Sequence, residues 1–133
     1  MPDIFLVLFF VSILPILLAV AGGYFRVSEL GKFDNHRPRE QQAVLTGAGA
    51  RVVAAQKNAW EALIFFAAVT LIAVASPVDL DKLSAPAYLF LASRVVHPIM
   101  YAADLAALRS IVFAVGWFAC IYIFLIAYSA YGS

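Results

Sequence analysis

The residues from Arg51 to Glu61 combine a cation, an amide and a carboxylate at helical spacing. They read RVVAAQKNAWE and continue without a break into an apolar run. At about 100° per residue, Asn58 falls almost over Arg51, and Glu61 lies roughly 80° from Arg51. Ionisable groups at membrane depth are costly and face the protein interior or a wet cavity. This helix face is therefore the first candidate site.

A second polar set lies in the next apolar segment. Arg94, His97 and Tyr101 are spaced i, i+3 and i+7, which places them within roughly 60° on one helix face. The two segments are joined by a short loop, so we expect them to be antiparallel neighbours. Glu61 and Arg94 are similarly far from that loop, and we predict an ion pair between them. The alternative is a purely structural role, in which this pair and Asn58 only fix the helix register.

Cations outnumber acids around these two faces. The cations are Arg51, Lys57, Arg94 and Arg109, and the nearby acids are Glu61 and Asp104. A small polyanionic metabolite entering from the cytoplasm would balance this charge, because guanidinium groups grip carboxylates in a fork. Tyr101 and His97 would add hydrogen-bond donors. No group of residues has the spacing of a metal site, so we expect no metal.

The composition is that of an integral membrane protein. Of the 133 residues, 65% are hydrophobic and 13% are charged, and the mean hydropathy is +0.94. Soluble domains are only about 45–50% apolar. The net charge of +1 gives no reason to expect a nucleic-acid partner. The length suits one domain, which we place over residues 1–133.

The elements that position the polar faces are predicted to be four membrane helices. We expect an all-α membrane protein, an antiparallel four-helix transmembrane bundle, with helices at residues 4–25, 39–75, 86–103 and 110–131. The second segment exceeds the roughly 20 residues that span a bilayer, so its first third should project from the membrane or line a wet cavity. Gly47 and Gly49 are small enough for close helix approach. Residues 104–109 are expected to form a tight connection.

The basic residues predict the orientation. The first and third connections hold five of the nine Lys and Arg residues, namely Arg26, Lys32, Arg37, Arg39 and Arg109. The second connection holds only Lys82. By the positive-inside rule, the first and third connections should face the cytoplasm and both termini should lie outside it. We expect a multi-pass protein of a bacterial inner membrane.

Taken together, these motifs resemble the MAPEG family, the membrane-associated proteins of eicosanoid and glutathione metabolism. RVVAAQKNAWE carries the signature of the second family helix, SRVVHPIMY matches the third, and Arg109 follows at the start of the fourth. The NHRPREQ stretch at residues 35–41 is similar to the bacterial members. The resemblance covers most of the chain.

The resemblance implies a homotrimer that binds glutathione, as co-substrate, between adjacent subunits near the cytoplasmic face. It implies conjugation, peroxide reduction or isomerisation of lipophilic substrates held in membrane lipid. We therefore expect a glutathione transferase or peroxidase acting on lipophilic electrophiles or hydroperoxides. The implied glutathione-binding residues are Arg51, Asn58, Glu61, Arg94, His97 and Tyr101. The implied catalytic residues are Arg109, which would stabilise the thiolate, and Tyr101.

Two other functions remain open. One is a trimeric membrane protein that binds a lipid or a thiol without catalysis. It is favoured by Ala54, which lies where many eukaryotic members carry a further arginine. The other is a small transporter or channel that uses Glu61 and His97 as a proton relay. It ranks last, because the chain has no sign of the inverted repeats of transporters.

Overall fold

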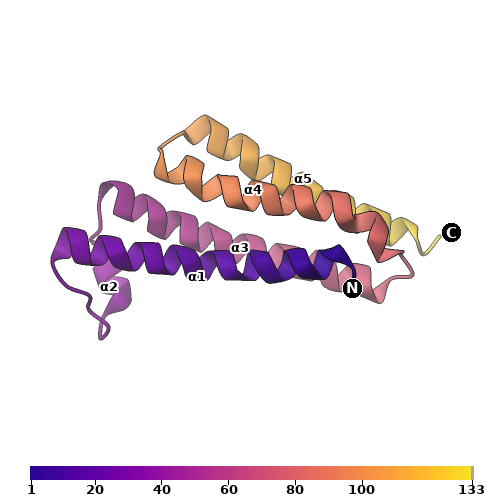
Figure 1. The fold of residues 1–133 in the computed structure, drawn as a ribbon. Helices are drawn as coiled ribbons and strands as arrows, with labels where there is room; N and C mark the ends of the chain where they lie inside the picture. Colours follow the sequence, from indigo (N-terminus) through magenta and orange to yellow (C-terminus); the bar gives the residue numbers. More distant parts are fainter. Residues whose placement is uncertain (133) are drawn as a thin grey trace.

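Four long helices carry most of the chain in the computed structural model, which describes residues 1–132 (Figure 1). They are α1 (Asp3–Leu30), α3 (Gly47–Ala75), α4 (Ser84–Ala102) and α5 (Ala106–Ser129). The short helix α2 (Pro38–Ala43) and the 3-10 turn η1 (Leu80–Leu83) lie in the connections. The part of the chain that is described contains no β-strand, so the all-helical class is confirmed.

Three of the four long helices are long and apolar enough to cross a membrane. These are α1, α3 and α5. Helix α4 is not among them; it has 19 residues and carries the polar side chains of Arg94 and His97. Helix α3 has 29 residues and is therefore roughly 43 Å long, against a hydrocarbon core of about 30 Å. Its first turns are thus long enough to leave the core, as the sequence predicts.

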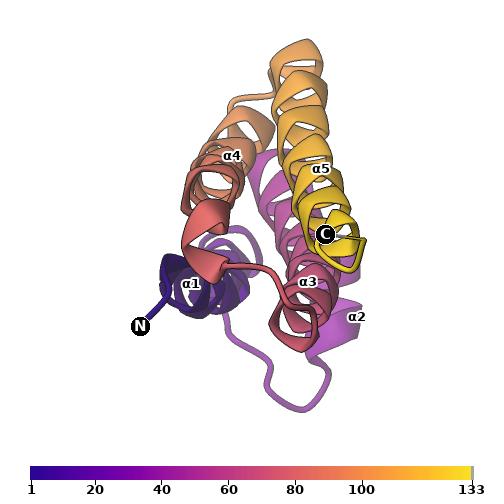
Figure 2. The ribbon, with the colours of Figure 1, turned by 90° about the vertical axis from the view of Figure 1, so that its right-hand side faces the viewer.

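The helices run antiparallel, and both basic connections lie at the same end. Figure 1 shows the α1–α3 and α4–α5 connections at one end, with the α3–α4 connection and both termini at the other. Helices α1 and α3 lie side by side, as do α4 and α5, which the end-on view of Figure 2 also shows. Toward the end with the two basic connections, the α4–α5 pair diverges from the α1–α3 pair (Figure 1).

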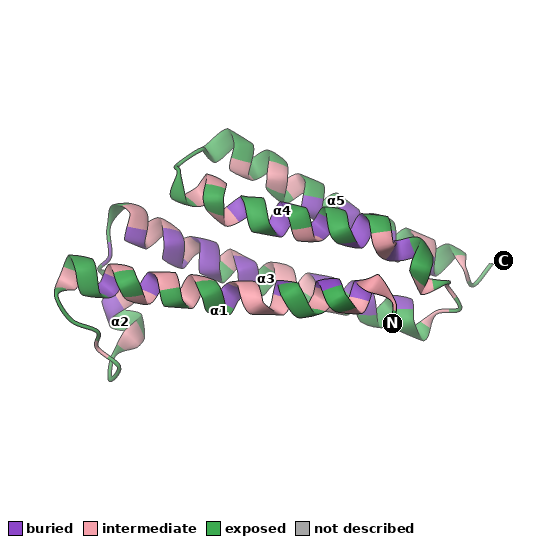
Figure 3. Cartoon of the chain, viewed as in Figure 1, coloured by how far each residue is buried: buried purple, intermediate pink, exposed green. Residues whose placement is uncertain are grey.

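The main apolar cluster occupies the half of the bundle near the termini. Its buried side chains come from the start of α1 and α4 and from the later turns of α3 and α5; they include Ile4, Val7, Phe66, Phe90, Cys120 and Ile123 (Figure 3). The rings of Phe66 and Phe90 stack with centroids 4.4 Å apart. The other half of the bundle instead buries polar side chains, namely Arg26, Gln41, Gln56, Arg94 and His97.

The prediction of one helix over residues 39–75 is wrong at its start, because residues 44–46 are not helical and separate α2 from α3. Gly47, the first residue of α3, has a φ of +52°, a left-handed value that favours glycine. No atom lies within 4 Å of a Cβ built there, so Gly47 does not serve close packing as predicted. Gly49 does: a Cβ would lie 2.5 Å from Oε1 of Glu29 and 3.1 Å from Cβ of Phe25.

A carboxylate from α1 completes the N-terminus of α3. The N-cap residue Thr46 makes no hydrogen bond of its own to the helix. Instead, its backbone N–H donates to Oε2 of Glu29 at 3.1 Å. The first N–H groups of a helix lack partners inside the helix, and negative charge is favourable beside them. The start of α3 is therefore fixed by its neighbour α1.

The α1–α3 connection is held onto the end of α1 by Arg26. This side chain is only 4% exposed. It donates to the Gln41 side chain and to the Asp34 carbonyl, and it lies 3.9 Å from the centroid of the Phe33 ring. Gln41 in turn donates to the Lys32 carbonyl at 2.7 Å. The sequence shows Arg26 only as one of several basic residues, whereas it is the anchor of this segment.

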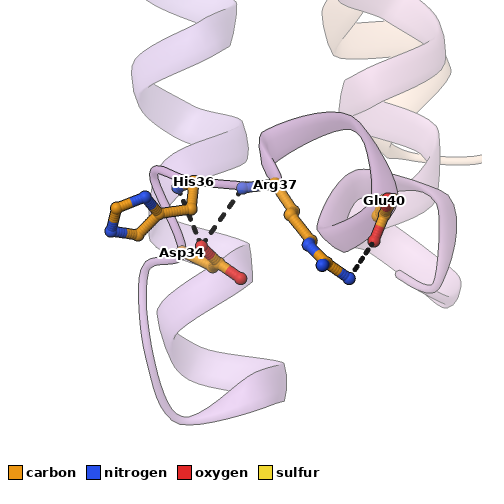
Figure 4. A network of polar contacts seen from close by, with 4 residues as sticks. All are labelled: Asp34, His36, Arg37 and Glu40. Carbon is orange, nitrogen blue, oxygen red and sulfur yellow. Dashed lines mark hydrogen bonds and ion pairs between the residues drawn. The ribbon is translucent and has the colours of Figure 1, made fainter.

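Asp34 shapes the tip of the same connection (Figure 4). Its Oδ1 accepts hydrogen bonds from the backbone N–H groups of His36, at 2.8 Å, and Arg37, at 3.2 Å. An exposed ion pair joins Arg37 and Glu40 at 3.5 Å, a kind of contact that adds little stability. His36 is thus engaged through its backbone, as expected for a loop histidine.

The close contact of α4 and α5 at Gly116 gives a stability prediction. A Cβ at Gly116 would overlap the Ser93 hydroxyl and lie 3.5 Å from the Phe90 ring. We expect Gly116→Val to lower the melting temperature in detergent, since overpacking costs about 1–3 kcal/mol. Ala92→Val, on the exposed face of α4, is the matched control and should change it little. Equal melting temperatures for both variants would show that the two helices do not touch there.

Candidate functional site

The polar half of the bundle is organised by a hydrogen bond between α3 and α4. Arg94 is 3% exposed, and its Nη2 donates to Oδ1 of Asn58 at 2.6 Å. The two residues share a level because α3 and α4 run antiparallel on either side of a short connection. Buried charged groups are retained only with partners, because an unpaired one is very costly. The guanidinium has a partner here, but a neutral one.

The predicted ion pair between Glu61 and Arg94 is wrong for this chain. Among the residues that the structure describes, no ion pair involves Glu61. Its side chain is exposed, one turn along α3 from Asn58. Glu61 and Arg94 nevertheless line the same cavity, so a carboxylate and a guanidinium face one space without neutralising each other directly.

This cavity has a volume of about 210 Å³ and an otherwise apolar wall. Its lining residues are Glu61, Ala62, Phe65, Phe90, Arg94, Phe113 and Trp117. The rings of Phe65 and Trp117 stack across α3 and α5, with centroids 6.3 Å apart. The cavity therefore combines two charged side chains with an aromatic wall.

The four aromatic side chains of the wall are lining residues of the candidate site that the sequence interpretation missed. A signal for them was present, since each follows or precedes a polar site residue in steps of four. Phe65 follows Glu61, Phe90 precedes Arg94, and Phe113 and Trp117 follow Arg109 at four and eight residues. Residues four apart share a helix face. The aromatic rings therefore extend the polar faces toward the middle of the bundle.

His97 lies one turn beyond Arg94 in α4. It is buried, and one of its ring nitrogens lacks a hydrogen-bond partner among residues 1–132. It is 2% exposed, and its Nδ1 has no hydrogen-bond partner within the described chain. Its ring lies edge-on to Tyr101, with centroids 5.8 Å apart, and 6.4 Å from the ring of Phe113. Buried polar atoms in proteins usually have partners, so this nitrogen is an exception among the described residues.

Tyr101 and Arg109 meet across the α4–α5 connection. The guanidinium carbon of Arg109 lies 4.4 Å from the centroid of the Tyr101 ring, a cation–π contact. The connection is shorter than the predicted residues 104–109, because α5 begins at Ala106 and Arg109 lies in its first turn. No hydrogen bond of the Tyr101 hydroxyl is found among residues 1–132. Both groups can therefore serve a ligand.

Arg51 belongs neither to the cavity lining nor to the Tyr101–Arg109 contact. Its Nε donates to the carbonyl oxygen of Ala102, the last residue of α4, at 3.2 Å. The site residues thus form three parts along one side of the bundle. Glu61 and Arg94 line the cavity, and Asn58 is bonded to Arg94. His97, Tyr101 and Arg109 follow toward the connection. Arg51 contacts the end of α4.

The Asn58–Arg94 contact predicts strong coupling between two substitutions. Asn58→Leu leaves a buried guanidinium without its acceptor, so the free energy of unfolding should fall by about 1–3 kcal/mol or more. The double variant Asn58→Leu with Arg94→Met should lose less than the sum of the two single losses, as measured by unfolding in detergent. Glu61→Gln is the control and should stay close to the parent, because the carboxylate is exposed. Strictly additive losses would contradict the coupling.

The sequence matches a known protein family over most of its length. Residues 4–129 match the model of the MAPEG family. Neither the curated proteins nor the solved structures gave a significant match. The family match covers almost the whole chain, and α1, α3 and α5 are long and apolar enough to span a membrane. The chain is an integral membrane protein, and it belongs to the MAPEG family.

Proposed function

We propose that this protein is a glutathione-dependent membrane transferase or peroxidase that acts on lipophilic electrophiles or hydroperoxides. The observation that carries the proposal is the buried guanidinium of Arg94, which is hydrogen-bonded to Asn58 and lines one aromatic cavity together with the unpaired carboxylate of Glu61. Glutathione offers carboxylates to a guanidinium and an ammonium group to a carboxylate. Membership of the MAPEG family is consistent with this co-substrate.

The proposed binding residues would have different roles toward glutathione. Arg94 would hold a carboxylate of glutathione, and Glu61 would pair with its amino group. Asn58 orients the Arg94 guanidinium, and the unpartnered Nδ1 of His97 would contact the peptide. The thiol would then point toward Tyr101. No metal takes part in this scheme.

The proposed chemistry begins with the thiolate. A thiol with a pKa near 8.5 is mostly protonated at neutral pH, and only the thiolate is a good nucleophile. A cation or a hydrogen-bond donor beside the sulfur favours the thiolate. Arg109 would supply the cation and Tyr101 the hydroxyl donor. Lowering the thiol pKa by about two units is worth roughly 2.7 kcal/mol.

Two reactions follow from one thiolate. With an electrophile, the sulfur forms a bond to carbon, and a leaving group departs or the adduct takes up a proton. With a hydroperoxide, the sulfur attacks the outer oxygen and breaks the O–O bond, which gives an alcohol and glutathione sulfenic acid. A second glutathione then displaces water and forms the disulfide. Phe65, Phe113 and Trp117 give the lipophilic partner an apolar surface near the cavity.

A homotrimer is part of the proposal, because the cavity of one subunit is small. Drug-sized ligands occupy pockets of about 300–1,000 Å³, whereas this cavity has about 210 Å³. A tripeptide would therefore extend beyond it, and a neighbouring subunit would cover the remainder. The end of the bundle with Arg26, Lys32 and Arg109 would face the cytoplasm of a bacterial cell, where glutathione is dissolved.

The roles of Arg109 and Tyr101 give a direct functional test. We expect Arg109→Ala to bind glutathione with nearly the affinity of the parent but to form roughly 10- to 100-fold less thiolate-dependent product, since a charge-assisted contact is lost. Binding would be measured by calorimetry and the thiolate by its ultraviolet absorbance in detergent. Lys82→Ala, a cation at the opposite end of the bundle, is the matched control.

Two other outcomes would change the assignment. Unchanged thiolate in Arg109→Ala at saturating glutathione, with a loss in Tyr101→Phe, would move the catalytic role to Tyr101. Binding of glutathione by the parent without any thiolate would favour the non-catalytic ligand-binding protein instead.

A further inference from the structure

The α4–α5 connection has a defined hydrogen-bond pattern that leaves the last carbonyl of α4 without a backbone partner in the described part of the chain. Asp104 adopts a left-handed conformation, with a φ of 59°. The N–H of Asp104 donates to the Tyr101 carbonyl at 3.1 Å, and the N–H of Leu105 donates to the Met100 carbonyl at 2.9 Å. This pair of bonds is the Schellman pattern that closes many helices. It satisfies two of the last carbonyls of α4 but not that of Ala102.

Arg51 takes this remaining carbonyl. Its Nε–H donates to the Ala102 oxygen at 3.2 Å, from the second turn of α3. Cations are favourable at helix C-termini, where the unpaired carbonyls carry partial negative charge. Arg51 does not line the cavity that holds Glu61 and Arg94. Its hydrogen bond is therefore made to the helix end and not within the cavity.

We propose that Arg51 is a positioning residue: it holds the C-terminal end of α4 and so places Tyr101 and Arg109, instead of gripping a carboxylate of glutathione. The inference rests on the proposed function. It also departs from the role that the family resemblance implies for Arg51.

The short connection makes this placement rigid. Tyr101 precedes Ala102 in the chain, and Arg109 lies over the Tyr101 ring at 4.4 Å. On the far side, the N–H of Arg109 donates to the Leu105 carbonyl at 2.9 Å, so α5 starts directly after the closing pattern. A shift of the α4 end would therefore move both side chains together. Displacements of about 1 Å in a catalytic group can cost up to about 100-fold in rate.

Two substitutions separate the donor of Arg51 from its charge. The amide nitrogen of glutamine lies as many bonds from Cα as the arginine Nε does, so Arg51→Gln keeps the donor and removes the charge. Arg51→Met removes both. Lys57→Met removes an exposed cation from the same helix and controls for charge alone. Each variant would be assayed for glutathione affinity, for thiolate formation and for amide hydrogen exchange over residues 99–110.

We expect Arg51→Met to form roughly tenfold less thiolate, with faster exchange in residues 99–110 and little change in affinity. Arg51→Gln should recover most of the thiolate and of the exchange protection, and Lys57→Met should resemble the parent. Equal losses of affinity in Arg51→Gln and Arg51→Met, with parental exchange, would overturn the inference and assign Arg51 to a glutathione carboxylate. If the parent forms no thiolate, the proposed function fails, and the exchange comparison still decides whether Arg51 holds the helix end.

Discussion

The site depends on the burial of one cation, Arg94, among apolar helices. Removing a guanidinium from water is costly unless it is paired and hydrogen-bonded. Asn58 supplies an acceptor at 2.6 Å but no negative charge. The contact therefore fixes how α3 and α4 face each other and leaves a positive charge uncompensated in the fold. An anionic ligand in the adjoining cavity would complete the balance, and this links the packing of the helices to the proposed co-substrate.

The two halves of the bundle are held together by different interactions. Near the termini, stacked aromatic and branched side chains such as Phe66, Phe90 and Ile123 form a continuous core. Near the basic connections, the helix pairs diverge (Figure 1) and are held by directed polar contacts. Arg26 fixes one connection and Arg51 the other. Close packing makes the first half rigid, while in the second half the buried Nδ1 of His97 has no partner among the described residues.

Much of this arrangement was predictable from the sequence, because apolar runs and helical spacing report directly on membrane helices. The long helices, their antiparallel order and the shared face of Arg94, His97 and Tyr101 follow from that pattern. The break before Gly47 did not, since glycine adopts either sign of φ and the sequence does not say which. Helices α1 and α5 also extend beyond the apolar runs that revealed them.

The partners of the charged residues were the least predictable part. Spacing places Glu61 and Arg94 level with each other, but it does not say which acceptor the guanidinium reaches. In the structure the acceptor is Asn58. Arg51 likewise shares a face with Asn58 in the sequence, yet its partner is a backbone carbonyl 51 residues away. Backbone acceptors carry no signature in a sequence pattern.

The carboxylate that completes α3 has a consequence for the end of α4. Helix α3 obtains its first hydrogen-bond acceptor from Glu29, at the far end of α1. Arg51 lies one turn further on in α3 and donates to the last carbonyl of α4. The start of α3 is thus tied to α1, and the end of α4 is tied to α3. A change at Glu29 would therefore reach the end of α4 through the start of α3.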